Sequence, residues 1–183
     1  MPNRKLPKVD LPPWQVFRPS QSPIVIDSIK QMPEDTYGFI YRITFLDGMM
    51  YIGKKNLYST RTVACLKSGK PRLNADGTAA ERIYRNTGKG FRKAFEIVKT
   101  ESDWKTYFGS HKSCKVRFPK TREILHYAFN KLELTYLEAK YLFIYEVLES
   151  PNYINDNILG SFYRGKFYDT VNGTTKEDLS ESC

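Results

Sequence analysis

Cysteine and histidine are scarce in this sequence. It contains three widely separated cysteines, Cys65, Cys114 and Cys183, and two histidines, His111 and His126. Without a Cys-x-x-Cys pair the usual zinc-finger ligands are missing, and an odd number of distant thiols does not suggest a disulfide framework. We therefore expect reduced thiols and no structural zinc.

Long hydrophobic runs are missing as well. No apolar run approaches the roughly 18 residues that a membrane helix needs. The N-terminal stretch, MPNRKLPKVDLPPWQ, has no apolar core of the kind found in secretion signals. Tyr, Phe and Trp make up 14% of the 183 residues, enough for one domain with a packed core. We expect a cytoplasmic protein with no membrane partner.

Acidic residues are rare in one part of the chain. Between Lys54 and Arg122 there are 18 Lys and Arg against 5 Asp and Glu, a balance of +13 in a chain of net charge +9. The other residues therefore carry a balance of −4. Such segregation favours a surface that binds a polyanion, above all double-stranded DNA. The alternative is a solvated basic surface that keeps the protein soluble.

The composition along the chain predicts three parts. Residues 1–30 are rich in proline and are expected to form an arm that packs on the core. Residues 31–160 form the main domain, with a basic insertion over 55–120. Residues 161–183 are polar, end in acidic residues and predict a loose tail.

A β-hairpin is the clearest local feature. Residues 37–46 and 49–54 read as strands, and Asp47-Gly48 between them is a strong turn signal. A strict two-residue turn places Tyr41 and Tyr51 on opposite faces of the hairpin. A one-residue bulge or a three-residue loop places them together, and the sequence does not choose between these registers.

Four later segments complete the expected structure. Residues 79–86 predict a short helix, and residues 91–98 are ambiguous between strand and helix. Residues 122–129 predict a third strand, and residues 133–149 carry the strongest helical pattern of the chain.

Glu138 stands out within that helix. Its neighbours at helical spacing are apolar or aromatic: Leu134, Tyr141, Leu142 and Tyr145. A carboxylate in an apolar stripe needs a cation or a metal, because burying it unpaired is costly. The alternatives are a salt bridge to a Lys or Arg, or a place at the rim of the stripe.

Several of these features together resemble the GIY-YIG nuclease superfamily. The matching motifs are Phe39-Ile40-Tyr41, Tyr51-Ile52-Gly53 followed by Lys54, the helix with Glu138, and Tyr153-Ile154-Asn155. The resemblance covers about residues 37–157 and implies an α+β fold, with a small three-stranded antiparallel sheet flanked by helices. Residues 104–110, WKTYFGS, are similar to a stretch of the phage homing endonucleases in this superfamily.

The resemblance also implies roles for individual residues. Tyr41 would be the general base for the attacking water, and Tyr51 would orient or stabilise the phosphate. Lys54 could lower the pKa of a phenol through its charge. Glu138 would hold the metal, Mg²⁺ or in its place Mn²⁺, because Mg²⁺ prefers oxygen ligands and keeps several waters.

Three further residues are implied by the same resemblance. Arg61 would clamp the phosphate, although its surroundings favour extended structure where the family has a helix. The other arginines that could take this role are Arg85, Arg92 and Arg117. Asn155 would fix the geometry of the site through hydrogen bonds. His111 would assist, unless it is an exposed loop residue.

The leading hypothesis is a metal-dependent DNA endonuclease of the phage homing or free-standing type, acting in the host cell cytoplasm. One alternative is a catalytically inactive, basic nucleic-acid-binding module on the same scaffold. Another is a restriction or repair nuclease of the same superfamily. Cutting both strands with one active site requires either a homodimer on DNA or two sequential nicks.

Overall fold

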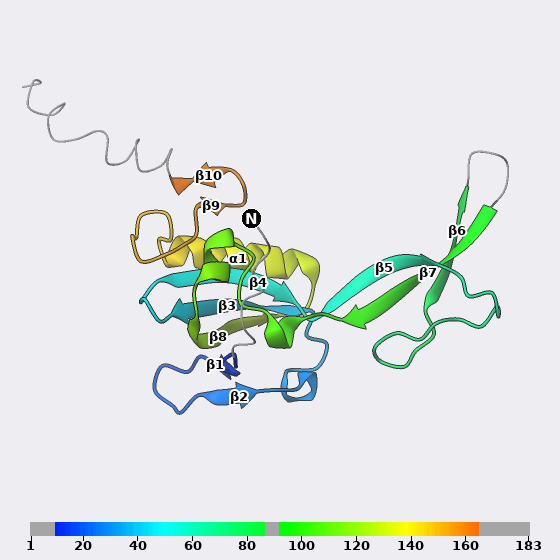
Figure 1. Cartoon of the computed structure of the whole chain (residues 1–183), viewed down its shortest axis with the longest axis horizontal. Coiled ribbons are helices and arrows are strands. Elements are labelled where there is room, and N and C mark those ends of the chain that lie inside the picture. Colours follow the sequence, from blue (N-terminus) through cyan, green and yellow to red (C-terminus); the bar gives the residue numbers. More distant parts are fainter. Residues whose placement is uncertain (1–9, 87–91, 165–183) are drawn as a thin grey trace, which may run out of the picture. The chain divides into compact units, whose positions relative to one another are not determined.

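The chain divides into two compact units. The structure is a computed structural model that describes residues 10–86 and 92–164. The first unit comprises Met1–Lys55 and Lys105–Cys183, and the second spans Asn56–Trp104. Figure 1 shows the elements of each unit along the chain.

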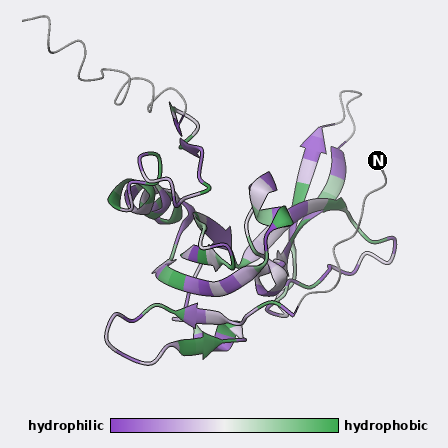
Figure 2. Cartoon of the chain, turned by 60° about the vertical axis from the view of Figure 1, so that its left-hand side comes forward, coloured by the Kyte–Doolittle hydropathy of each residue, from purple (hydrophilic) through white to green (hydrophobic). Residues whose placement is uncertain are grey.

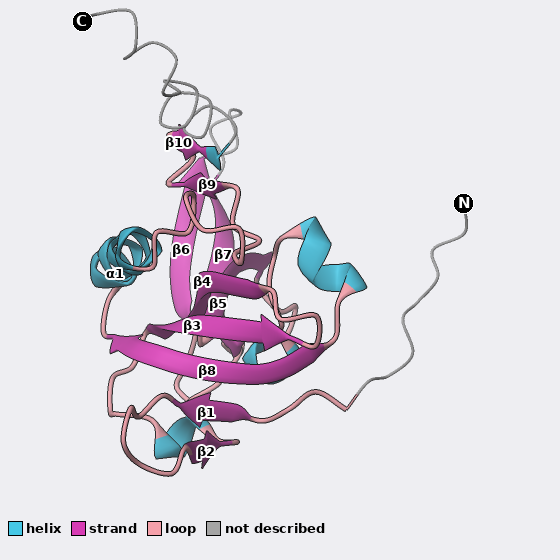
Figure 3. Cartoon of the chain, turned by 90° about the vertical axis from the view of Figure 1, so that its left-hand side faces the viewer, coloured by secondary structure: helices cyan, strands magenta, loops and turns pink. Residues whose placement is uncertain are grey.

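A five-stranded sheet forms the centre of the first unit. Its order is β2-β1-β8-β3-β4, and these strands span Ile24–Ile26, Trp14–Val16, Pro119–Ala128, Gly38–Phe45 and Met50–Asn56. Strand β1 runs parallel to β8 and antiparallel to β2, whereas β3 runs antiparallel to β8, so the sheet is mixed. Figure 3 shows the strands side by side.

The expected α+β class is confirmed, but the expected three-stranded antiparallel sheet is too small. Strands β8, β3 and β4 are its three members. Proline-rich residues near the N-terminus add β1 and β2. Trp14 and Ile26 are buried, the backbone of β1 pairs with the free edge of β8, and β2 pairs with β1. Strands of three residues are too short to show an alternating hydrophobic pattern in the sequence.

The helix α1, Lys131–Ile144, packs on one face of this sheet (Figure 3). It begins after Asn130, whose Oδ1 accepts the Glu133 N–H at 2.8 Å, an N-cap. It ends five residues before the predicted boundary, and Glu146 beyond it has a φ of +47°. The core between helix and sheet includes Ile40, Ile52, Ala128, Leu134, Leu137 and Leu142.

The opposite face of the sheet carries an aromatic cluster. The rings of Trp14, Phe39 and Tyr41 meet edge to face, with centroids 5.1 to 6.4 Å apart. Arg122 is buried beside them, and its guanidinium donates to the carbonyls of Pro12, Lys105 and Tyr107. Burial lowers the pKa of Arg122 to about 10. This arginine ties the N-terminal segment and the Tyr107 segment to β8.

The second unit is a three-stranded antiparallel sheet in the order β5-β7-β6. These strands span Tyr58–Ala64, Arg92–Glu101 and Glu81–Asn86. The helix predicted over residues 79–86 is therefore wrong, because pairing with β7 overrides the helical propensity of this segment. The ambiguous segment 91–98 is part of strand β7 from Arg92 on.

Short elements complete the described part of the chain. They are the 3₁₀ helices η1 (Ile29–Gln31), η2 (Trp104–Thr106) and η3 (Lys112–Val116) and the strands β9 (Asn157–Ile158) and β10 (Phe162–Tyr163). No described helix is long and apolar enough to cross a membrane. The predicted division into an arm, a main domain and a tail stays a prediction. Most of the tail, with Cys183, lies outside the described residues.

The hairpin between β3 and β4 uses a three-residue loop. The Phe45 N–H donates to the Met49 carbonyl at 2.8 Å, and Gly48 closes the loop with a φ of +83°. This register puts Tyr41 across from Gly53. A Cβ atom on Gly53 would lie only 2.6 Å from the Tyr41 hydroxyl, so the missing side chain makes room for the phenol.

Gly53→Ala tests this register. Tyr41 is only 1% exposed and is packed on all sides, so its ring cannot move away from the added methyl group. We expect the free energy of unfolding to fall by about 1 to 3 kcal/mol, as in other overpacked cores. Urea unfolding measures the loss, with Asn56→Ala at the exposed end of the same strand as the control. Equal stability of the two variants would contradict the register.

Candidate active site

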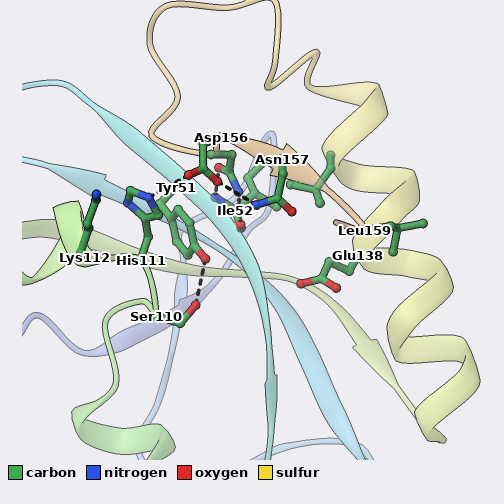
Figure 4. Close-up of a pocket in the computed structure, with 11 residues that line it drawn as sticks. Tyr51, Ile52, Ser110, His111, Lys112, Glu138, Asp156, Asn157 and Leu159 are labelled. Atoms are coloured by element: carbon green, nitrogen blue, oxygen red, sulfur yellow. Dashed lines mark hydrogen bonds and ion pairs between the residues drawn. The ribbon is translucent and has the colours of Figure 1, made fainter. Parts of the chain in front are cut away.

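An open cavity of about 590 Å³ lies along the outer edge of β4 in the first unit. Tyr51 comes from β4, Glu138 from α1, and Ser110, His111 and Lys112 from the segment around η3. Asp156 and its neighbours, which follow α1, form the third wall (Figure 4). Because β4 is the last strand in the sheet, no strand of the described residues fills this space.

Tyr51 presents its phenol to the cavity. Its hydroxyl is 3.1 Å from the Ser110 hydroxyl, and its ring stacks beside that of His111 with centroids 6.5 Å apart. Burial raises the pKa of Tyr51 to about 12, despite the opposing effect of the Ser110 hydrogen bond. The Tyr51 phenol is therefore protonated at neutral pH and has a proton to donate.

Tyr41 lies behind Tyr51 and does not line the cavity. The two ring centroids are 6.2 Å apart, and the Tyr41 hydroxyl donates to the Tyr107 hydroxyl at 3.4 Å. Burial, followed by the neighbouring phenols of Tyr51 and Tyr107, raises the pKa of Tyr41 well above its ordinary value. The three-residue loop thus brings the two tyrosines of the tripeptides together, the outcome that the sequence left open.

Glu138 lies at the rim of the apolar stripe on α1 and forms an ion pair with Lys54. The Glu138 Oε2 is 2.9 Å from the Lys54 Nζ, which also donates to the Thr135 hydroxyl at 3.2 Å. The Glu138 side chain is 21% exposed and the Lys54 side chain 34%. Lys54 therefore pairs with the carboxylate. The expected lowering of a phenol pKa is not found, because the pKa values of Tyr41 and Tyr51 are both raised.

His111 is oriented by two contacts. Its Nδ1 accepts the Ser113 N–H at 3.2 Å, and its Nε2 is 3.3 Å from Asp156 Oδ2. Burial opposes ionisation of Asp156, but hydrogen bonds from Asn157 and His111 lower the pKa of this carboxyl below its ordinary value. The acceptor role of Nδ1 places the ring proton on Nε2, facing Asp156.

The sequence reasoning missed Ser110, Lys112 and Asp156 as cavity residues. Ser110 ends the WKTYFGS stretch, and Asp156 directly follows the Tyr153-Ile154-Asn155 motif. Their positions next to recognised motifs were the available signal. Lys112 had none, because the segment around it is basic throughout.

Asn155 completes the hydrogen bonding of the edge strand. It is buried, its Oδ1 accepts the Ile52 N–H at 3.0 Å, and its Nδ2 donates to the Ile52 carbonyl at 2.7 Å. Just before it, Met50 exchanges backbone hydrogen bonds with Asn152 and Ile154. The side chain thus takes over where backbone pairing stops, and it holds Tyr51 and Gly53 in place on either side of Ile52.

Arg61 lies on β5 in the second unit, is exposed and pairs across the sheet with Val98. Arg85 and Arg92 lie on the other two strands of that unit. Arg117 belongs to the first unit, where it binds the hairpin residue Asp47 at 2.8 Å. The phosphate-clamping role of Arg61 stays a prediction. Among the described residues that line the cavity, Lys112 is the only Lys or Arg.

The donor set at the cavity fits a loosely held divalent cation. Of the two Glu138 oxygens, only Oε2 has a hydrogen-bond or ion-pair partner among the described residues, which leaves Oε1 for a metal. Residues 10–86 and 92–164 contain no cluster of three or more acidic, His or Cys groups that could form a complete cage. Mg²⁺ suits such a site, because it accepts one carboxylate with waters and substrate oxygens as its other ligands.

Asn155→Ala should lower the free energy of unfolding by about 2 to 4 kcal/mol, because it leaves a buried N–H and a buried carbonyl of Ile52 unpaired. Urea unfolding measures the change. The matched control is Asn152→Ala, whose side chain is exposed, and it should cost less than about 0.5 kcal/mol. Similar losses in both variants would refute the bridging role.

Comparison with known proteins agrees with the motifs. Residues 24–158 match the model of a family described as "Putative endonuclease segE, GIY-YIG domain". No curated protein and no solved structure matches the chain. The match covers the hairpin with both tripeptides, the second unit, α1 and the Asn155 motif. The chain belongs to the segE family of GIY-YIG endonuclease domains.

Proposed function

We propose that this protein is a metal-dependent endonuclease that hydrolyses phosphodiester bonds of double-stranded DNA, as a free-standing endonuclease of the phage homing type. One observation carries the proposal. The tyrosine of the second tripeptide, the glutamate of α1 and the histidine before η3 open into one cavity, with Lys112 at its wall. The expected location in the host cell cytoplasm rests on the sequence alone.

Hydrolysis forms a bond from a water oxygen to phosphorus and breaks the bond from phosphorus to the leaving 3′ oxygen. The water loses a proton and the leaving oxygen gains one. Of the two phenols, the one that lines the cavity is Tyr51, so we assign it the contact with the attacking water or the phosphate. This revises the sequence-based role of Tyr41, which instead supports Tyr51 from behind.

The other cavity residues divide the remaining tasks. Lys112 attracts the phosphate, and His111 with Asp156 provides a proton donor or acceptor at the opposite wall from Glu138. Glu138 would hold Mg²⁺, or Mn²⁺ in its place, through its unpartnered oxygen. The bound cation supplies stabilisation for the negative charge that develops on the phosphate. Lys54 holds the carboxylate in position through their ion pair.

Glu138→Gln should reduce nicking of supercoiled plasmid by about 100-fold or more, because the amide cannot replace the charged metal ligand. Nicking by the wild type should require Mg²⁺ or Mn²⁺ and stop in EDTA. Glu149→Gln, an exposed acid beyond the end of α1, is the control and should nick at the wild-type rate. EDTA-resistant nicking, or an active Glu138→Gln protein, would remove the metal from the account.

The two tyrosines can be separated by removing one hydroxyl at a time. Tyr51→Phe should slow nicking by about 100-fold, the usual contribution of a proton-transfer group, and Tyr41→Phe by less than about tenfold. Single-turnover rates at saturating enzyme measure both. The reverse order would restore Tyr41 as the base and overturn our assignment.

A further inference from the structure

The second unit contains a two-stranded ribbon that its third strand does not accompany. Strand β5 pairs with β7 only as far as Ala64, opposite Phe95. Strand β6 pairs further, as far as Asn86, opposite Arg92. The ribbon end, which we define as Tyr84–Asn86 with Arg92–Ala94, therefore has only two strands. We propose that this ribbon end binds double-stranded DNA.

Charge is the first argument. From Arg82 to Phe95 the sequence contains no Asp or Glu. The cations Arg85, Arg92 and Lys93 are all exposed, and none of them has an ion-pair partner among the described residues. The ribbon end is hydrophilic (Figure 2). An uncompensated cluster of this kind is suited to a polyanion.

Charged residues closer to the centre of the sheet form ion pairs, unlike Arg85, Arg92 and Lys93. Glu96 is fully buried on β7, 3.2 Å from Arg72 and 3.6 Å from Arg82. Burial alone would raise the pKa of Glu96, but the hydrogen bonds and charges of these arginines lower it. Arg72 and Arg82 thus serve the interior of the unit. The sequence places a compensating acid where the sheet has three strands and none at the ribbon end.

The pairing of the ribbon end is the second argument. Arg85 stands directly opposite Lys93, and like charges in this position destabilise a strand pair. Among the described residues, the Arg85 guanidinium contacts two neutral groups, the Phe95 ring at 5.7 Å and the Thr62 hydroxyl at 3.4 Å, and no anion offsets the repulsion from Lys93. A pair that costs stability in the free protein becomes favourable when a phosphate lies between the two cations.

Shape decides the kind of polyanion. The major groove of DNA is about 12 Å wide and admits a two-stranded β-ribbon. Alternation along the strands places Arg85 and Lys93 on one face and Arg92 on the other, beside Asn86 and the 63% exposed Tyr84. Cations on both faces can meet phosphates on both sides of the groove. The ribbon end would thus contribute DNA affinity separately from the catalytic cavity; the inference rests on the proposed function for its choice of DNA.

The test is binding of the full chain to a fluorescein-labelled 24-bp duplex, followed by anisotropy in EDTA between 50 and 200 mM KCl. Binding without metal is independent of cleavage, so the inference can fail while the nuclease proposal stands, and the reverse. The variant is Arg85→Gln/Arg92→Gln/Lys93→Gln. The control, Lys30→Gln/Lys120→Gln/Lys140→Gln, removes three exposed charges from the first unit.

We expect the ribbon variant to lose affinity by about tenfold or more. The slope of log affinity against log salt should become shallower by about 2 to 3, since each phosphate contact contributes about 0.9. The control should change the slope by less than about 1. Equal effects of the two variants, no duplex binding by the wild type, or tighter binding to the single strand by the wild type would overturn the inference.

Lys93→Glu guards against a purely structural effect. It turns the like-charge pair with Arg85 into an opposite-charge pair, so the melting temperature should stay the same or rise. Duplex affinity should nevertheless fall by about threefold or more at 50 mM KCl. A folded Lys93→Glu protein with unchanged affinity would also contradict the proposal.

Discussion

The register of the β3–β4 hairpin is the constraint on which the site depends. One hydrogen bond, from the Phe45 N–H to the Met49 carbonyl, fixes a three-residue loop. With one residue fewer in the loop, every side chain of β4 would change faces. Tyr51 would leave Tyr41, Gly53 would no longer make room for the phenol, and Ile52 would lose its place in the core.

The outer edge of β4 is the edge of the sheet beside which the cavity lies. An unpaired edge exposes backbone groups that invite further pairing. Here the segment after α1 pairs with Met50 at the start of this edge through backbone hydrogen bonds, and the Asn155 amide pairs with the backbone of Ile52. Arg164 fixes this segment by donating to the carbonyls of Val147, Ser150, Tyr153 and Asn155. The cavity opens beside this covered edge.

Local patterns revealed the hairpin, the third strand and α1, because each follows from a few residues with strong preferences. The sheet of the second unit was harder to predict. The segment with Ile83 and Tyr84 has a helix-like composition, and only its partner β7, with Ala94 and Phe95 opposite, makes it a strand. Such long-range pairing leaves no trace in a short sequence window.

The candidate site, like the fold, was predictable from the sequence only in part. The motifs pointed to Tyr51, Glu138 and Asn155, and the structure adds what each contacts. The sequence could not show that Tyr41 is almost fully buried. It also could not show that Lys54 forms its ion pair with Glu138. Asp156 was missed because its contact with His111 joins residues 45 positions apart.

Terbium luminescence tests most directly whether the Glu138 carboxylate binds a cation in the cavity that the Tyr51 phenol lines. Tb³⁺ takes oxygen ligands, and its emission under ultraviolet excitation of tyrosine requires a phenol close to the bound ion. The account predicts a saturable signal that Mg²⁺ displaces, that Glu138→Gln abolishes, and that Tyr51→Phe weakens without changing the affinity. An undiminished signal in Glu138→Gln would contradict the account, because the cation would then bind elsewhere.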